Sequence, residues 1–208
     1  MPPAPDGAPP YDAVVLAGGA ARRLGGADKP GARVGGRALV ERVAGAVADA
    51  GRIVVVGPAR DGLAGAVFVQ ESPPGGGPVP ALRAGLEAVT APWVALLAAD
   101  LPFLRADHVG RLLAAAAPAG GAVLVDQDGR EQWLAGVWRT ETLRAALGVY
   151  EGRSLRGLLG PLLPVCLGLP VGEDGRAPWF DCDTAEDLAA AETRATPRPP
   201  DDTHGGTR

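Results

Sequence analysis

The stretch DAVVLAGGAARRLGGADKPG, residues 12–31, decides the fold, because it joins an apolar run directly to a glycine-rich loop. The run DAVVLA, residues 12–17, is typical of a strand that is buried on both faces. The loop after it holds two adjacent arginines, an aspartate and a lysine. Glycines let backbone N–H groups approach a phosphate closely, and the basic side chains supply positive charge. Ligands of open α/β sheets bind where strands end, so this loop predicts a polyphosphate site.

The rest of the first half alternates short apolar runs with helical patterns. The further runs that resemble buried strands are 52–57, 66–70, 93–99 and 121–126. Apolar residues at three- and four-residue spacing predict helices at 38–50, 80–90 and 106–117. This order predicts a single three-layer, Rossmann-like α/β domain with a mostly parallel central sheet and helices on both faces.

The second half is less regular. Residues 131–139 are compatible with a strand, and residues 140–150 begin as a helix for which Thr140 is a plausible N-cap. Residues 152–160 could form a short helix. The prolines of PLLPVCLGL, residues 161–169, favour a strand at the edge of the sheet. The final helix follows residue 183, where Thr184 and Asp187 are spaced like a capping box.

Composition limits the class of protein. The chain has 208 residues, 47% of them hydrophobic, which suits one globular domain. Its net charge is −4 with both signs interspersed, so no basic stripe for nucleic acid is expected. The longest apolar run, Trp93–Ala99, is too short to span a bilayer. No membrane partner is therefore expected.

The two ends of the chain differ from its body. Residues 1–10 are rich in proline and predict a disordered lead, and residues 196–208 predict a disordered tail. The nucleotide-binding domain is then expected over residues 11–195. The lead lacks the basic and apolar regions of a secretory signal, and Cys166 and Cys182 form no CxxC pair. These features favour a cytoplasmic protein, expected as a monomer or weak oligomer.

Two common phosphate motifs are absent from the loop. Lys29 follows Asp28 and precedes Pro30, so the loop is not a P-loop, and the residues after Gly18 exclude the G-x-G-x-x-G fingerprint. A flexible surface loop with incidental charge is the plainer alternative. It does not explain why the loop directly follows a buried strand.

The loop resembles the signature L-A-G-G-x-x-x-R-M-G-G-x-D-K of the MobA-type nucleotidyltransferases, the molybdenum cofactor guanylyltransferases. The match runs from Leu16 through Arg23 to Lys29, and leucine replaces methionine at position 24. Three later segments also resemble the family in the expected order, and together the matches span about residues 12–192. They are GGGPVPALRAGL (75–86), LLAADLPFL (96–104) and WFDCDTAEDL (179–188).

The resemblance implies a Mg²⁺-dependent enzyme that transfers GMP from GTP to molybdenum-molybdopterin and releases pyrophosphate. It implies that Arg23, Lys29 and Asp100 are catalytic and that Asp100 is the magnesium ligand. The nucleotide would be bound by residues of the loop and of two later segments: Leu16, Ala17, Gly18, Gly19, Lys29, Glu71 and Asp100. The local sequence supports the role that the resemblance implies for Asp100, because a carboxylate after an apolar strand is costly unless water, a cation or hydrogen-bond donors reach it. The alternative is that Asp100 caps the turn that follows.

Several positions depart from the family pattern. Asp181 and Asp183 replace asparagines, and either could contact a metal, or Asp183 could N-cap the last helix. Gly57 stands where better-known members have an asparagine that contacts the nucleotide. Glu71 aligns with an aspartate near the guanine, although it could also be a solvent-facing loop residue. Its carboxylate could accept from the guanine N1–H and N2–H₂ groups.

Other departures concern the acceptor. Gln132 and Trp133 replace the usual His-Pro or Gln-Pro, and Arg153 and Arg156 could contact the acceptor's phosphate or form a basic surface. A cytidylyltransferase, or another nucleotidyltransferase with a different phosphorylated acceptor, is therefore the nearest alternative. A non-catalytic nucleotide-binding module is the alternative from another class. His108 and His204 have no partner pattern.

Overall fold

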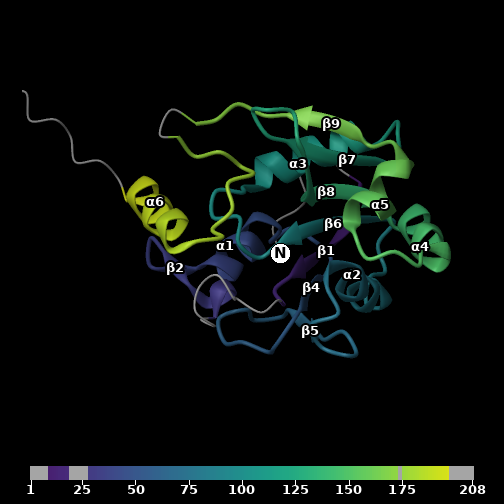
Figure 1. Ribbon diagram of the computed structural model, residues 1–208, viewed down its shortest axis with the longest axis horizontal. Coiled ribbons are helices and arrows are strands. Elements are labelled where there is room, and N and C mark those ends of the chain that lie inside the picture. The colour runs from purple at the N-terminus through teal and green to yellow at the C-terminus, as the bar shows by residue number, and fades with distance from the viewer. Residues whose placement is uncertain (1–8, 19–27, 173–174, 197–208) are drawn as a thin grey trace, which may run out of the picture.

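A seven-stranded sheet forms the centre of the protein, in the order β5-β4-β1-β6-β8-β7-β9 (Figure 1). The structure, a computed structural model, describes residues 9–18, 28–172 and 175–196. The strands are β1 (Tyr11–Leu16), β4 (Ile53–Val56), β5 (Val67–Val69), β6 (Trp93–Ala98), β7 (Gly121–Val125), β8 (Glu131–Arg139) and β9 (Val165–Gly168). Strand β8 pairs antiparallel with both neighbours, and every other pairing in the sheet is parallel. The predicted mostly parallel sheet is confirmed.

Helices cover both faces of the sheet because its strands alternate their side chains. Ala13 and Val15 of β1 pack in the cluster that contains α1 and α3, whereas Val14 and Leu16 pack in the cluster that contains α2, α4 and α5. The helices are α1 (Leu39–Ala46), α2 (Pro78–Glu87), α3 (Ala106–Ala116), α4 (Thr140–Val149), α5 (Leu155–Leu159) and α6 (Ala185–Ala195), with short 3₁₀ turns η2 (Lys29–Gly31) and η3 (Gly160–Leu162). The predicted three layers are confirmed.

A third, smaller cluster attaches the last helix to the domain. Helix α6 packs on a short hairpin of β2 (Arg33–Val34) and β3 (Arg37–Ala38), and Figure 1 shows α6 and β2 side by side at one end of the sheet. Phe103, from the loop after β6, and Cys182 belong to this cluster. The loop after β6 and the segment before α6 are therefore held together, which matters for the site below.

The cap predicted for α6 is confirmed. The Thr184 side chain accepts a hydrogen bond from the Asp187 backbone N–H at 3.1 Å, and Asp187 accepts from the Thr184 backbone N–H at 2.8 Å. This reciprocal pair satisfies two donors at the start of the helix. The alternative cap, Asp183, is wrong, because Thr184 occupies the N-cap position.

Two details of the sequence prediction are wrong. Arg139, not Thr140, is the N-cap of α4, because β8 runs directly into the helix and the buried Thr140 hydroxyl donates to the Ala91 carbonyl at 2.8 Å. Strand β5 is not buried on both faces, because it lies at the edge of the sheet and Val67 is 38% exposed. The edge position predicted for residues 161–169 is confirmed by β9.

Helix α2 lies very close to the sheet, and Gly85 makes this approach possible. A Cβ atom at Gly85 would lie 2.6 Å from Cγ1 of Val14 and 2.9 Å from Cγ2 of Val56. Replacing Gly85 with alanine is therefore expected to lower the free energy of unfolding by about 1–3 kcal/mol, measured by urea denaturation. Gly110 of α3 is the matched control, because a Cβ there meets nothing within 4 Å. Gly110→Ala should stabilise the protein by up to about 1 kcal/mol, and equal effects of the two substitutions would contradict the packing described.

The two cysteines are free and differ in environment. Cys166 is exposed, whereas Cys182 is buried. Burial, with the negative charge of Asp100 nearby, raises the pKa of the Cys182 thiol to about 12. Because the thiolate is the reactive form, Ellman's reagent should label Cys166 rapidly and Cys182 only after denaturation. Fast labelling of a Cys166→Ser variant would contradict this prediction.

The ends of the chain lie mostly outside the described residues. The predicted lead (1–10) has only residues 9 and 10 within them, and the predicted tail (196–208) only residue 196. Their predicted disorder and the domain bounds of 11–195 stay predictions. Within the described part of the chain, no helix has both the length and the apolar character needed to cross a bilayer.

Candidate active site

The loop after β1 begins beside two other segments of the sheet's carboxyl edge. The Ala17 backbone N–H donates to the Val56 carbonyl at 2.8 Å, and the Leu16 carbonyl accepts from the Ala99 N–H at 3.1 Å. Gly18 is exposed, and a Cβ there would lie 3.9 Å from both carboxylate oxygens of Glu71. The structure thus brings four of the predicted nucleotide-binding positions, Leu16, Ala17, Gly18 and Glu71, to one place.

Glu71 is a buried residue, not a solvent-facing one. It is 7% exposed, and its Oε1 atom accepts from the Gly75 backbone N–H at 2.9 Å. The contact fixes the carboxylate at the edge of the glycine loop that precedes α2. The plainer alternative, a solvent-facing loop glutamate, is therefore wrong.

Gly57 has a structural reason to lack a side chain. Its φ is +151°, and a Cβ there would lie 2.9 Å from the Ala17 carbonyl oxygen. Any larger residue would push the backbone of the loop after β1 away. An asparagine contact of the kind inferred for other family members is excluded while this backbone geometry is kept.

Lys29 joins the loop after β1 to Asp100. Its ammonium forms ion pairs with Oδ2 of Asp100 and, at 2.6 Å, with Oδ1 of Asp183. The side chains of Lys29 and Asp100 are each 18% exposed, so the pair is largely shielded from solvent. Residues from three distant parts of the sequence therefore meet at one charged centre.

The position of Lys29 is fixed by its neighbours. Asp28 forms an ion pair with Arg60 from the segment after β4, and this hydrogen bond holds the pKa of the Asp28 carboxyl below its usual range. Pro30 lies in the η2 turn, which begins at Lys29. Proline at the start of such a turn restricts the backbone and so limits where the Lys29 side chain can go.

The charge of Lys29 is stabilised by its partners. Burial disfavours the ammonium, but hydrogen bonds and Coulombic attraction from Asp100 and Asp183 outweigh it and raise the pKa of Lys29. Lys29 is therefore protonated at neutral pH, which is the form that attracts phosphate oxygens.

The carboxylates at this centre outnumber the cations described there. Partial burial, with the charges of Asp183 and Asp100, raises the pKa of Asp181. The Oδ1 atom of Asp100 is buried and has no hydrogen-bond partner among the described residues. A buried carboxylate oxygen without a partner is costly, so this donor set fits a cation. Mg²⁺ is usually bound by only one or two carboxylates plus phosphate oxygens and waters, so a single carboxylate such as Asp100 is compatible with it.

A cavity of about 520 Å³ opens beside Asp100. It brings together residues of four segments that the sequence associates with metal or acceptor. Those residues are Asp100, Gln132, Trp133, Arg156, Asp181 and Asp183. Its volume is in the range of small-molecule sites, and its mixed polar and aromatic lining could hold a ring system with a charged group.

Some predicted residues do not reach this cavity, and one unpredicted residue does. Arg153 is exposed and does not line the cavity, whereas Ser154 does. Trp179 also lines the cavity but is not among the residues predicted from the sequence, although its place beside the Phe180–Asp183 segment could have indicated it. His108 has a structural role, because its Nδ1 accepts from the Arg105 backbone N–H at 3.2 Å at the start of α3. His204 lies outside the described residues.

Arg23 and Gly19 also lie outside the described residues. Their predicted roles in catalysis and nucleotide binding therefore stay predictions. They stand in the sequence between Gly18, which lies near Glu71, and Asp28, which precedes Lys29.

Comparisons with known proteins show the family to which the chain belongs. The family described as the MobA-like NTP transferase domain matches residues 13–165. The molybdenum cofactor guanylyltransferase of Bradyrhizobium sp. is 35% identical over 196 residues, covering 88% of this chain and 92% of that protein.

Two solved structures share the fold. The molybdopterin-guanine dinucleotide biosynthesis protein A of Archaeoglobus fulgidus aligns with a TM-score of 0.68 and 21% identity, over 88% of this chain and 97% of that chain. The 2-C-methyl-D-erythritol 4-phosphate cytidylyltransferase of Thermus thermophilus aligns with a TM-score of 0.66 and 24% identity, over 88% and 98% of the two chains.

Proposed function

Because the chain belongs to the family of MobA-like NTP transferase domains, we propose that it transfers GMP from GTP to the terminal phosphate of molybdenum-molybdopterin. The products are the guanine dinucleotide form of the cofactor and pyrophosphate. One observation carries the proposal: Lys29, from the loop after β1, meets Asp100 at the mouth of a cavity large enough for an acceptor.

The nucleotide lies along the carboxyl edge of β1. Backbone N–H groups at Gly18 and Gly19 hold the triphosphate, and Leu16 and Ala17 set the direction in which the loop leaves the sheet. Arg23 and Lys29 neutralise charge on the α-phosphate and on the departing pyrophosphate. Because Lys29 is held by Asp100 and Asp183 before the reaction, it stabilises charge with little reorganisation in the transition state.

The transfer is a single in-line displacement. An oxygen of the acceptor phosphate attacks the α-phosphorus of GTP and forms the new P–O bond, while the bond from that phosphorus to the bridging oxygen of the β-phosphate breaks. Pyrophosphate leaves with the bonding electron pair. The protein contributes position and charge rather than a covalent intermediate. In-line attack requires the acceptor to lie opposite the leaving group, and the cavity beside Asp100 is the space that it would occupy.

Asp100 would hold the magnesium ion that this reaction requires, and Asp181 and Asp183 line the same cavity. When bound, Mg²⁺ would supply positive charge to the donor phosphates. The Oδ1 atom of Asp100, which has no hydrogen-bond partner among the described residues, supports this assignment.

Glu71 selects guanine by accepting from its N1–H and N2–H₂ groups, a donor pair that adenine lacks. Glu71→Gln is therefore expected to weaken GTP binding about tenfold or more, because a charged hydrogen bond is lost, and to change ATP binding little. Glu87→Gln on the exposed face of α2 is the matched control. Isothermal titration with each nucleotide and Mg²⁺ checks the prediction. Equal losses for GTP and ATP would show that Glu71 supports the loop rather than reading the base.

The proposal is tested by pyrophosphate release from GTP, CTP, ATP and UTP in the presence of Mg²⁺ and purified molybdenum-molybdopterin. Release with GTP alone is expected. Release with CTP would favour a cytidylyltransferase, for which the Asp-x-Asp-Thr sequence at 181–184 is the favouring observation. Nucleotide binding without release under all conditions would favour a binding module. The predicted cytoplasmic location and monomeric or weakly oligomeric state stay predictions.

A further inference from the structure

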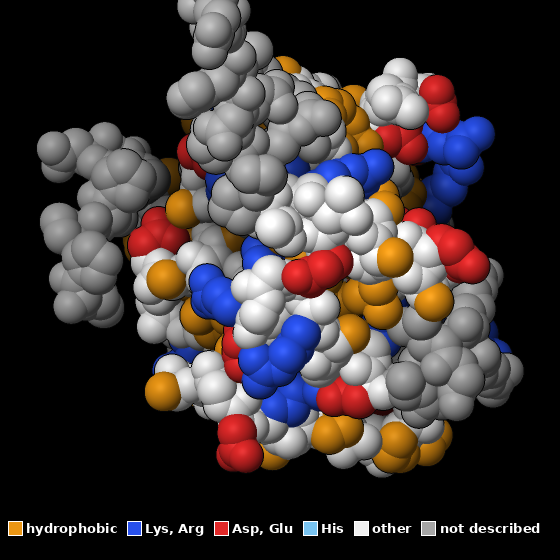
Figure 2. Space-filling model, turned by 90° about the vertical axis from the view of Figure 1, so that its left-hand side faces the viewer, with side chains coloured by type: hydrophobic (Ala, Val, Ile, Leu, Met, Phe, Trp, Pro, Cys, Tyr) orange, Lys and Arg blue, Asp and Glu red, His pale blue; other side chains and the backbone are white. Residues whose placement is uncertain are grey.

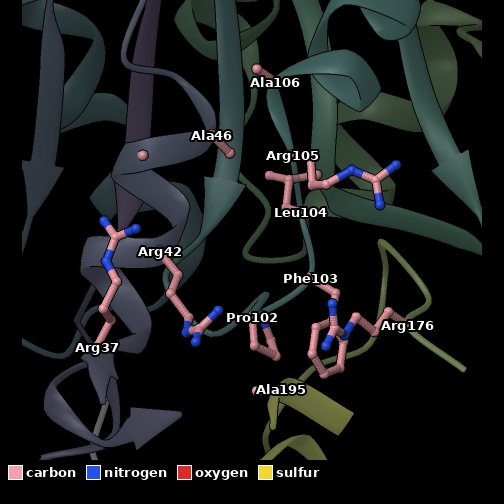
Figure 3. Close-up of a pocket in the computed structure, with 11 residues that line it drawn as sticks. Arg37, Arg42, Ala46, Pro102, Phe103, Leu104, Arg105, Ala106, Arg176 and Ala195 are labelled. Atoms are coloured by element: carbon pink, nitrogen blue, oxygen red, sulfur yellow. The ribbon is translucent and has the colours of Figure 1, made fainter. Parts of the chain in front are cut away.

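A second cavity, of about 330 Å³, lies beside the segment that follows Asp100 (Figure 3). Its floor is Pro102 and Phe103, which are both buried. One wall is α1 with the adjoining β3. The other includes Arg176, which precedes α6, and Ala195 at the end of α6. Among the described residues, four arginines and no carboxylate line it: Arg37, Arg42, Arg105 and Arg176.

The face that carries α6 holds charged side chains of both signs, with Lys and Arg interspersed with Asp and Glu (Figure 2). In the part of the chain that the structure describes, three acids near the cavity have partners. Asp107 pairs with Arg105, Glu41 accepts from the Ala38 backbone N–H, and Glu192 accepts from the Gly35 N–H at 2.7 Å.

Arg42 is the central cation. Its Nε donates to the Val34 carbonyl at 2.6 Å, which holds the guanidinium in place, and Figure 3 shows the group directed toward Pro102. Among the described residues no carboxylate oxygen lies within 4.0 Å of it, so its terminal N–H groups remain for a ligand.

The other arginines surround Arg42 with positive charge. The Arg37 guanidinium donates to the Glu41 carbonyl at 3.1 Å and lies over Gly45. Arg176 is placed over the Phe103 ring, 6.0 Å from its centroid, and donates to the Arg194 carbonyl. Burial, Arg37 and Arg176 lower the pKa of Arg42, and only Glu192 acts in the opposite direction. A half-buried cation among like charges is relieved by a bound anion.

We propose that this arginine pocket, defined by Arg37, Arg42, Phe103 and Arg176, binds a small phosphate-bearing anion at a site separate from the Asp100 cavity. Guanidinium groups bind phosphate and carboxylate oxygens in a two-pronged manner. Arg42 and Arg176 approach from opposite sides of Pro102 and Phe103 (Figure 3). A phosphate has at least three terminal oxygens to share between the two guanidinium groups, whereas a carboxylate has only two. The inference does not depend on the proposed transferase function.

The test is a titration of the ¹⁵N-labelled full chain with sodium pyrophosphate, followed by NMR. The backbone amides of Gly45, Ala46 and Ala106, which line the pocket, report binding there and not at Asp100. Saturable shifts are expected, and Arg42→Gln should weaken the affinity about tenfold because charged hydrogen bonds are lost. Arg111→Gln, which removes an exposed arginine of α3 outside the pocket, should leave it unchanged.

Three further arms make the result decisive. Arg37→Gln, at an exposed position, should weaken binding severalfold and serves if Arg42→Gln proves unstable to heat. Ribose 5-phosphate and inorganic phosphate distinguish a phosphate ester from the free ion as the preferred ligand. Sodium acetate at equal ionic strength should bind more weakly than either. Shifts that stay linear with concentration, an Arg42→Gln affinity equal to that of Arg111→Gln, or equal binding of acetate would overturn the proposal.

Discussion

Replacing Lys29 with alanine is expected to lower turnover about 100-fold or more, which is the loss seen when one preorganised charge-stabilising donor is removed. The ammonium is the described cation that joins the loop after β1 to Asp100, and it is held between two carboxylates. Without it, charge that builds on the α-phosphate and on pyrophosphate has one stabilising partner fewer. Steady-state pyrophosphate release with saturating GTP and acceptor measures the effect. A loss below about tenfold would contradict the assignment.

Two further variants, Lys29→Arg and Arg33→Ala, are compared with Lys29→Ala. The sequence has 20 lysines and arginines together, and Lys29 is the only lysine among them. An ammonium is a compact point charge and a guanidinium is a larger planar group, so Lys29→Arg should not restore activity between the two carboxylates. Arg33→Ala removes an exposed cation four residues away and should change turnover by about twofold at most. Full activity of Lys29→Arg would mean that only net charge matters.

Replacing Asp100 with asparagine is expected to lower turnover about 100-fold or more and to remove the response to Mg²⁺. Asparagine keeps the shape of the side chain, and the backbone bond from the Cys182 N–H to the Asp100 carbonyl at 3.2 Å is unaffected. The fold should therefore persist while the metal-binding charge is lost. The readouts are pyrophosphate release and the Mg²⁺-dependent rise in melting temperature with GTP.

The matched control for Asp100 is Asp107→Asn. Asp107 lies in the same segment after β6, but it is exposed and pairs with Arg105. Its replacement should leave the Mg²⁺ response intact. An Asp100→Asn variant that keeps its Mg²⁺-dependent stabilisation would place the metal elsewhere, and the ion pair of Asp100 with Lys29 would then be structural.

The parallel half of the sheet could be predicted from the sequence, because strands buried on both faces are nearly continuous apolar runs. The sequence of residues 131–139 is compatible with a strand, but the antiparallel pairing of β8 with β6 could not be predicted, because it joins residues far apart in the sequence. Thr140 illustrates the same limit. Its residue type suits an N-cap, but a tertiary contact with Ala91 places it inside the helix.

The site could be predicted in part for a similar reason. The carboxyl ends of parallel strands meet at one edge, so the approach of Lys29 to Asp100 follows from their positions after β1 and β6. Lys29 and Asp183 are 154 positions apart in the sequence, and the packing of α6 on the β2–β3 hairpin brings them together. No local sequence pattern predicts this pairing. The exclusion of a side chain at Gly57 likewise depends on the approach of the Ala17 carbonyl.

The central claim is that the loop after β1 and Asp100 hold one metal-bound triphosphate between them. A crystal structure of the protein with Mg²⁺ and a non-hydrolysable GTP analogue tests it most directly. The account predicts a metal ion about 2.1 Å from a carboxylate oxygen of Asp100, with the triphosphate running past Gly18 to Lys29. A metal bound away from Asp100, or a triphosphate outside that loop, would contradict it.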